Sequence, residues 1–128
     1  MKRFAFRLES VLRVRCFELE RARIQLVAIE SERNRRAEVF RLEIQQMAEG
    51  QTLLETEARA GADGERIGLR ADAVAAGRYR ALRAERAIGE LNEPLAEARR
   101  RVHHARGRVR SLERLKEDAE AEHRRQGL

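Results

Sequence analysis

The sequence predicts an all-α protein in which two long helices form an antiparallel coiled-coil hairpin. Three observations lead to this prediction: a heptad seam in the second half, a second apolar seam in the first half, and a glycine cluster between them. Charged residues make up 39% of the chain and aromatic residues 4%, with no Trp. An ordinary globular core is hard to build from this composition, whereas a helix pair keeps most of its surface in water.

In the first half, apolar residues recur at a spacing of seven, with one exception. These positions are Ala5, Leu12, Leu19, Leu26, Arg33, Phe40, Met47 and Leu54. The companion positions of the heptad include Leu8, Ala22 and Ile29, and they become polar at Arg36 and Glu43. Helix-forming residues fill the gaps, so we expect one helix from about Leu8 to about Ala58.

The segment Ala60-Gly61-Ala62-Asp63-Gly64 contains two glycines and an aspartate, which is the best turn signal in the chain. We therefore expect a turn at about 59–65 and a helix from about 66 to 125. Two long helices with a short connection must run antiparallel if they pair within one chain.

From Ile88 to Ala119 the seam positions follow gaps of three and four without a slip. They are Ile88, Leu91, Leu95, Ala98, Val102, Ala105, Val109, Leu112, Lys116 and Ala119. Such a narrow seam indicates a coiled coil with one partner helix. If the turn centres near Ala62, residue i faces residue 125 − i. Leu12 then faces Leu112, and large residues meet small ones along the seam.

In this register the polar break at Arg33 and Arg36 falls opposite Glu90 and Glu93, with which the arginines could pair. Pro94, the only proline, removes one helical hydrogen bond. Either the second helix kinks there, or it restarts with Asn92 as N-cap. We favour a kink, because the heptad register passes through Pro94 unchanged.

Length and charge restrict the function. At 128 residues we expect a single domain. The net charge of +6 comes almost entirely from arginine and implies an acidic partner, either a protein surface or nucleic acid.

Cys16 has no second cysteine to pair with, which favours a reducing compartment. No apolar run approaches the length of a membrane span, and the start lacks the apolar block of a secretory signal. We expect a cytoplasmic protein.

No pattern of catalytic residues stands out. The adjacent His103 and His104 would point about 100° apart on a helix, and His123 lies too far along to share a metal with them. There is no glycine-rich phosphate loop, and no serine has a base held beside it in a pocket. We therefore expect no enzymatic activity, no metal and no cofactor.

The most basic segment runs from Arg99 to Arg114, with seven arginines and one acidic residue, Glu113. It can be read as the solvated face of a coiled coil, or as a binding surface for an acidic partner. Aromatic residues that could stack on bases are missing here and no recognition motif is present, so we expect no specific binding of nucleic acid.

Two segments resemble a known family. The start, Phe4-Ala5-Phe6-Arg7-Leu8-Glu9-Ser10-Val11-Leu12-Arg13-Val14-Arg15, is similar to the F-x-F-x-L-x-x-V-L-x-x-R opening of the flagellar export protein FliJ family. Near the end, Val109-Arg110-Ser111-Leu112-Glu113-Arg114-Leu115-Lys116-Glu117 resembles that family's V-K-S-L-E-K-L-K-E-like segment. The two motifs cover about a fifth of the chain. Pro94 and the glycine-rich middle depart from the family pattern.

The resemblance implies a small cytoplasmic coiled coil that acts as the central stalk of the hexameric flagellar type III export ATPase. Members also contact the membrane protein of the export gate and export chaperones, at the inner membrane at the flagellar base. On this reading we expect the ATPase pore to contact the basic end of the hairpin through Arg7, Arg13, Arg106, Arg110 and Arg114. The alternatives are a stalk of a virulence-type type III secretion system, or a generic structural or nucleic-acid-binding coiled coil that pairs between chains.

Overall fold

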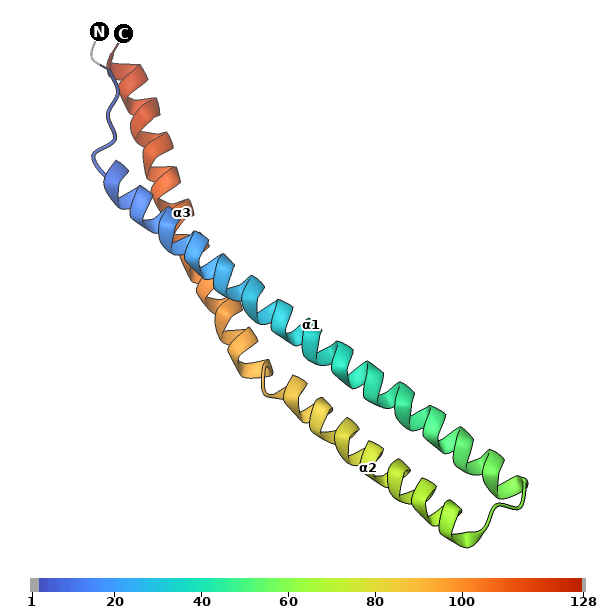
Figure 1. Ribbon diagram of the computed structural model, residues 1–128. Helices are drawn as coiled ribbons and strands as arrows, with labels where there is room; N and C mark the ends of the chain where they lie inside the picture. Colours follow the sequence, from blue (N-terminus) through green and yellow to red (C-terminus); the bar gives the residue numbers. More distant parts are fainter. Residues whose placement is uncertain (1–2, 128) are drawn as a thin grey trace. The chain divides into compact units, whose positions relative to one another are not determined.

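The computed structural model of the protein describes residues 3–127, and within them all regular structure is helical. Three helices follow one another: α1 at Glu9–Arg59, α2 at Gly64–Gly89 and α3 at Asn92–Gln126. No strand occurs in these residues. The predicted all-α class is therefore confirmed for the described chain (Figure 1).

The segment before α1 is not helical. Phe4, Phe6 and Leu8 are half-buried and alternate with the exposed Arg3, Ala5 and Arg7, which is the period of two of an extended chain. The ring of Phe4 lies 5.5 Å from that of His123 in α3. The prediction of Ala5 as a helical seam residue is wrong, because Ala5 is exposed and lies before α1. Phe4 and Phe6 contribute the apolar surface here, and only an extended segment turns both to the same side.

The connection between α1 and α2 has the expected position and chemistry. Gly61 has a φ of 79°, a left-handed conformation that glycine adopts without strain. The side chain of Asp63 then accepts a hydrogen bond at 2.8 Å from the backbone N–H of Arg66, which caps the start of α2. Both ends of α1 and the start of α2 lie within two residues of the predicted positions.

Near Pro94 the structure differs from the expected kink. α2 ends at Gly89, two residues lie outside either helix, and α3 begins at Asn92 with Pro94 in its first turn. The first turn is where proline costs least, since the N–H group that it lacks would have no helical partner there. The helix therefore restarts here, as in the alternative reading, with Asn92 as the first residue of α3 rather than as the cap before it.

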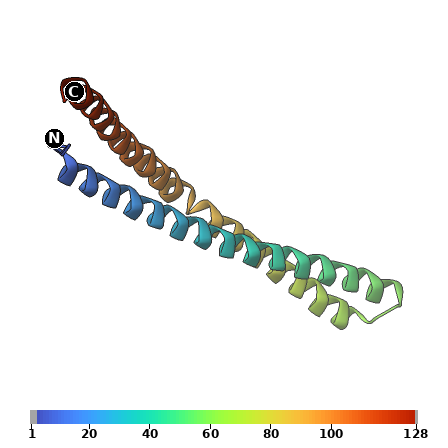
Figure 2. The same ribbon diagram turned by 90° about the horizontal axis from the view of Figure 1, so that it is seen from above.

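The chain divides into two compact units. Unit 1 comprises the residues up to Ile29 and those from Pro94 onward, and unit 2 comprises Glu30–Glu93. Each unit is a pair of helical segments that run in opposite directions: the first part of α1 with α3, and the rest of α1 with α2 (Figure 2).

Unit 1 contains one apolar cluster. Its buried members are Leu12, Leu19, Ala22, Val102, Ala105 and Val109, with Leu26 and Leu112 packed against them. Lys116 forms an ion pair with Glu9 at 3.0 Å, and their residue numbers add up to 125 as the predicted register requires. Arg108 and Glu18, which are 3.6 Å apart, depart from that register by one residue.

Unit 2 keeps a similar register with a different interior. The buried residues all come from α2: Val74, Gly77, Ala81 and Ala84. Ion pairs link the helices, with Arg80 3.1 Å from Glu43 and Arg70 3.1 Å from Glu57.

The predicted pairing across the polar break in unit 2 is found for one arginine. Arg36 lies 3.3 Å from Glu90 and also donates a hydrogen bond at 2.6 Å to the carbonyl oxygen of Ala87, near the end of α2. Arg33 is exposed and forms no such pair with Glu90.

Candidate functional site

The five arginines predicted to bind a partner all belong to unit 1 and all are exposed. Arg7 lies in the turn before α1, Arg13 lies on α1, and Arg106, Arg110 and Arg114 lie on α3. We call these five residues the terminal basic surface. The three on α3 are spaced by four residues, so they follow one side of that helix over about 12 Å.

Helix geometry places three of the five on the same flank of unit 1. Arg106 and Arg110 directly follow the buried Ala105 and Val109, and Arg13 directly follows the buried Leu12. Each of the three therefore points about 100° away from the packed seam. Because two antiparallel helices are related by a two-fold axis, equivalent positions on the two helices border the same groove.

The structure separates paired from unpaired arginines in the basic segment. Arg100 and Arg101 contact Glu97 at 2.7 and 3.3 Å, and Arg108 contacts Glu18. The hydrogen bond from Arg100, together with its charge, holds the pKa of the Glu97 carboxyl below its ordinary value. Within residues 3–127, the five arginines of the terminal basic surface make no ion pair with an acidic residue. Their charges are therefore available to a partner.

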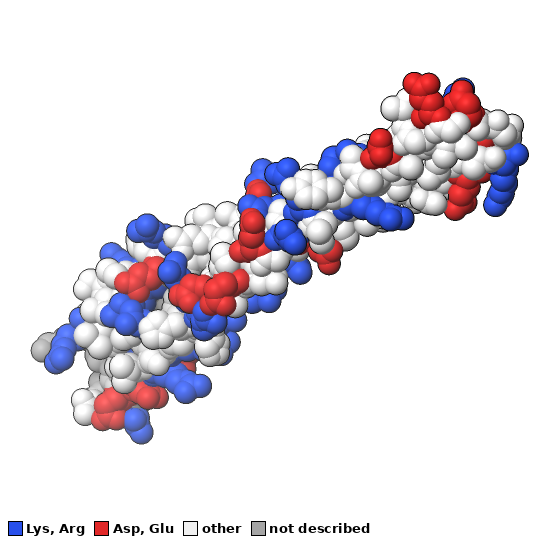
Figure 3. Space-filling view, turned by 90° about the horizontal axis from the view of Figure 1, so that it is seen from below, with Lys and Arg blue, Asp and Glu red and all other residues white. Residues whose placement is uncertain are grey.

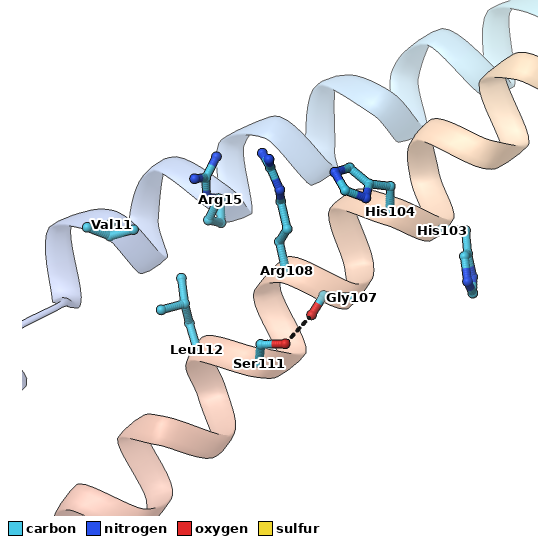
Figure 4. Close-up of a pocket in the computed structure, with 8 residues that line it drawn as sticks. All are labelled: Val11, Arg15, His103, His104, Gly107, Arg108, Ser111 and Leu112. Carbon is cyan, nitrogen blue, oxygen red and sulfur yellow. Dashed lines mark hydrogen bonds between the residues drawn. The ribbon is translucent and has the colours of Figure 1, made fainter.

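The other flank of unit 1 carries an open groove between α1 and α3 (Figure 4). Arg15 and Arg108 reach into it from opposite helices, and Glu18 contacts both, at 3.0 and 3.6 Å. His104 also points toward α1, whereas His103 points away, so the two imidazoles diverge. Since Glu18 balances much of the arginine charge, this groove is a weaker site for an anion than the opposite flank.

Sequence reasoning missed the bridging role of Glu18. The register places residue 18 opposite residue 107, one position from Arg108, and that signal was available in the sequence. The sequence alone does not give the rotamer of Arg108. In the structure this side chain reaches Glu18, whereas Arg106 and Arg110 contact no acidic residue within residues 3–127.

Both signs of charge occur on the surface. On the face drawn in Figure 3, Lys and Arg side chains lie among Asp and Glu side chains. No group of three or more His, Cys, Asp or Glu side chains in the described residues is arranged to hold a metal ion. Nor is any helix of this part of the chain long and apolar enough to cross a membrane.

Comparison of the chain with protein-family models, with curated proteins and with solved structures finds no match.

Proposed function

We propose that the protein is an antiparallel coiled-coil stalk of the flagellar type III export apparatus, without enzymatic activity of its own. One observation carries the proposal: the two segments that resemble the FliJ family lie at opposite ends of the sequence and are in contact in unit 1. Glu9 of the first segment pairs with Lys116 of the second at 3.0 Å. Leu12 of the first belongs to the same apolar cluster as Val109 of the second.

The terminal basic surface is the proposed binding site for the pore of the hexameric export ATPase. Its guanidinium groups are exposed and unpaired within the described residues, so binding would not first require an internal ion pair to break. Arginine can donate paired hydrogen bonds to the carboxylates and carbonyl oxygens of pore loops.

The remaining assignments follow from the family resemblance. The membrane protein of the export gate and the export chaperones are the further proposed partners. The proposed location is the cytoplasmic side of the inner membrane at the flagellar base.

A pair of charge reversals tests the proposal. The double variant Arg106→Glu, Arg110→Glu changes two exposed side chains outside the packed seam, so its cost to folding should stay within about 0.5 kcal/mol for each change. Placing negative charge against an anionic partner costs several kcal/mol. We expect the variant to keep its helical circular dichroism signal and melting temperature, and to lose both binding to the flagellar export ATPase and stimulation of ATP hydrolysis.

The matched control is Arg33→Glu, Arg78→Glu in unit 2. Both arginines are exposed, lie within helices and make no ion pair in the described chain, so the control has the same change in net charge. It should bind and stimulate the ATPase like the unmodified protein. If the control loses stimulation while the unit 1 variant keeps it, the ATPase site has been assigned to the wrong unit.

A further inference from the structure

The flank of unit 1 that carries Arg13, Arg106 and Arg110 also carries two further arginines. Eight residues of this unit directly follow a buried residue of the seam, which places them all on that flank. They are Arg13, Glu20, Arg23, Ala96, Arg99, His103, Arg106 and Arg110. Five arginines stand against one glutamate, so the row has a net charge of +4 with His103 neutral. We call these five arginines the basic flank.

The opposite flank of unit 1 has a balanced charge. The residues that directly precede a buried residue are Val11, Glu18, Arg21, Pro94, Glu97, Arg101, His104 and Arg108. Ion pairs form there: Arg108 reaches toward α1 (Figure 4) and lies 3.6 Å from Glu18, and Arg101 lies 3.3 Å from Glu97. Within residues 3–127, the arginines of the basic flank are exposed and make no ion pair.

On the basic flank, two like charges lie opposite each other. Facing residue numbers in unit 1 add up to about 125, so Arg99 lies opposite residue 26, about 4.5 Å along the axis from Arg23. Equivalent positions of antiparallel helices share a flank, so both side chains project to the same side. Positions beside a coiled-coil seam ordinarily hold opposite charges, as Glu18 and Arg108 do. Arg23 and Arg99 therefore repel each other where a salt bridge would be expected.

α3 itself offers no relief for Arg99. The residues three and four positions away, which are its neighbours on the helix surface, are Leu95, Ala96, Val102 and His103. None of them is acidic. A chain that gives up a favourable charge pair in its free state is expected to do so at a functional site.

The unbalanced charge indicates the class of partner. Arginine donates paired hydrogen bonds to carboxylates, and the basic flank extends from Arg13 to Arg23, about 15 Å along α1. A helix with glutamate at every fourth position presents a carboxylate about every 6 Å over such a length. None of the eight positions holds Phe, Tyr or Trp, so the bases of a nucleic acid would find no such ring to stack on.

We infer that the basic flank of unit 1 binds an acidic helical segment of a partner protein, which lies along the seam with one of its carboxylates held between Arg23 and Arg99. The terminal basic surface shares Arg13, Arg106 and Arg110 with this flank but contains neither Arg23 nor Arg99. The inference rests on the charge of the flank, and it does not depend on which protein supplies the acidic segment.

The melting temperature of the free protein tests whether the two arginines face each other. Arg99→Glu should raise it by about 2–4 °C at low ionic strength, because the new carboxylate can pair with Arg23. Arg108→Glu on the opposite flank is the control: it places a carboxylate against Glu18 and should lower the melting temperature. Circular dichroism measures both. A melting temperature that Arg99→Glu leaves unchanged or lowers overturns the inference.

Peptide binding tests the partner class. The probe is a fluorescent, alanine-rich helical peptide of about 16 residues with glutamate at every fourth position, and its glutamine counterpart is the control. Fluorescence anisotropy of the full-length protein at about 50 mM salt should show binding of the glutamate peptide only. Arg23→Gln, Arg99→Gln should weaken this binding by about fivefold. Glu20→Gln should strengthen it, because Glu20 is the one acidic residue among the eight positions.

The matched control for the double variant is Arg21→Gln, Arg78→Gln. Both arginines are exposed, lie outside the basic flank and make no ion pair in the described chain, so only the place of the lost charges differs. The control should bind the peptide like the unmodified protein. Equal weakening by the two double variants would mean that the peptide senses net charge alone, and this would overturn the inference.

A nucleic acid is the competing occupant. A single strand of about 15 thymidines is measured at the same salt concentration. If it binds more tightly than the acidic peptide and Arg23→Gln, Arg99→Gln removes that binding, the flank is a nucleic-acid site and the inference is wrong. None of these measurements involves the ATPase, so the acidic-helix site and the stalk function can fail separately.

Discussion

Units 1 and 2 are both antiparallel helix pairs, but they exclude water from their interiors to different extents. In unit 1 both helices contribute buried residues, among them Leu12 and Leu19 from α1 and Val102 and Val109 from α3. In unit 2, α1 contributes no buried residue, and the buried positions of α2 are small or β-branched. The same helix, α1, is thus well covered in one unit and poorly covered in the other.

The reason lies in the size of the facing side chains. Phe40, Met47 and Leu54 of α1 are large, but they stay half-exposed beside the small residues of α2. Folding of unit 2 therefore buries less apolar area than folding of unit 1, and ion pairs take a larger part in joining the helices of unit 2. Such pairs contribute little when solvent reaches them. The comparison teaches that heptad spacing predicts where helices meet, whereas side-chain volume decides how firmly. We expect unit 2 to open first.

The largest expected effect comes from removing a core side chain in unit 1. Leu19→Ala deletes a residue that is 7% exposed, at the centre of the apolar cluster. It should lower the free energy of unfolding by about 2–3 kcal/mol. Met47→Ala, at a half-buried position of unit 2, should cost about half as much. Urea denaturation followed by circular dichroism measures both. Equal losses for the two variants would show that the units are packed equally well.

A smaller change in the other direction is expected for Gly77→Ala. Gly77 is buried in the seam of unit 2, and an added methyl group would meet Arg80 and Met47 at 3.6–3.9 Å, which is ordinary contact. Alanine is also the better helix former, so we expect stabilisation by about 1 kcal/mol.

Gly107→Ala is the matched control in α3, where the added methyl group would have nothing within 4 Å. It should give only the gain in helix propensity, seen as a smaller rise in melting temperature. If Gly77→Ala destabilises the protein, the interior of unit 2 is already filled, and the contrast with unit 1 is wrong.

The smallest effect is expected at the end of α2. Arg36→Ala removes the hydrogen bond to the Ala87 carbonyl oxygen and the ion pair to Glu90, both partly exposed to solvent. The loss should be about 0.5–1 kcal/mol. It should appear as faster amide hydrogen exchange in the last turn of α2. Arg33→Ala, which removes no such contact, should leave exchange there unchanged. Equal exchange in both variants would mean that Arg36 does not hold this helix end.

Local sequence rules determined much of this protein. The heptad spacing predicted the helices and the register in which Lys116 meets Glu9, because a helix with one apolar seam can bury it in only one way. The glycine cluster predicted the turn, because Gly61 adopts a conformation that other residues reach only with strain. The structure leaves the five arginines of the terminal basic surface exposed, as expected for charged residues beside a narrow seam.

Tertiary structure decided the rest. The segment of Phe4 and Phe6 is extended, and the Phe4 ring lies against His123 of α3, a contact that the heptad spacing does not specify. A carbonyl group near the end of α2 is satisfied by Arg36 of another helix. Which arginines are neutralised is likewise set by long-range neighbours, such as Glu18 beside Arg108. Helix propensity and heptad spacing depend on residues that are near one another in the sequence. These features depend instead on contacts between residues that are far apart in the sequence and meet only in the folded chain.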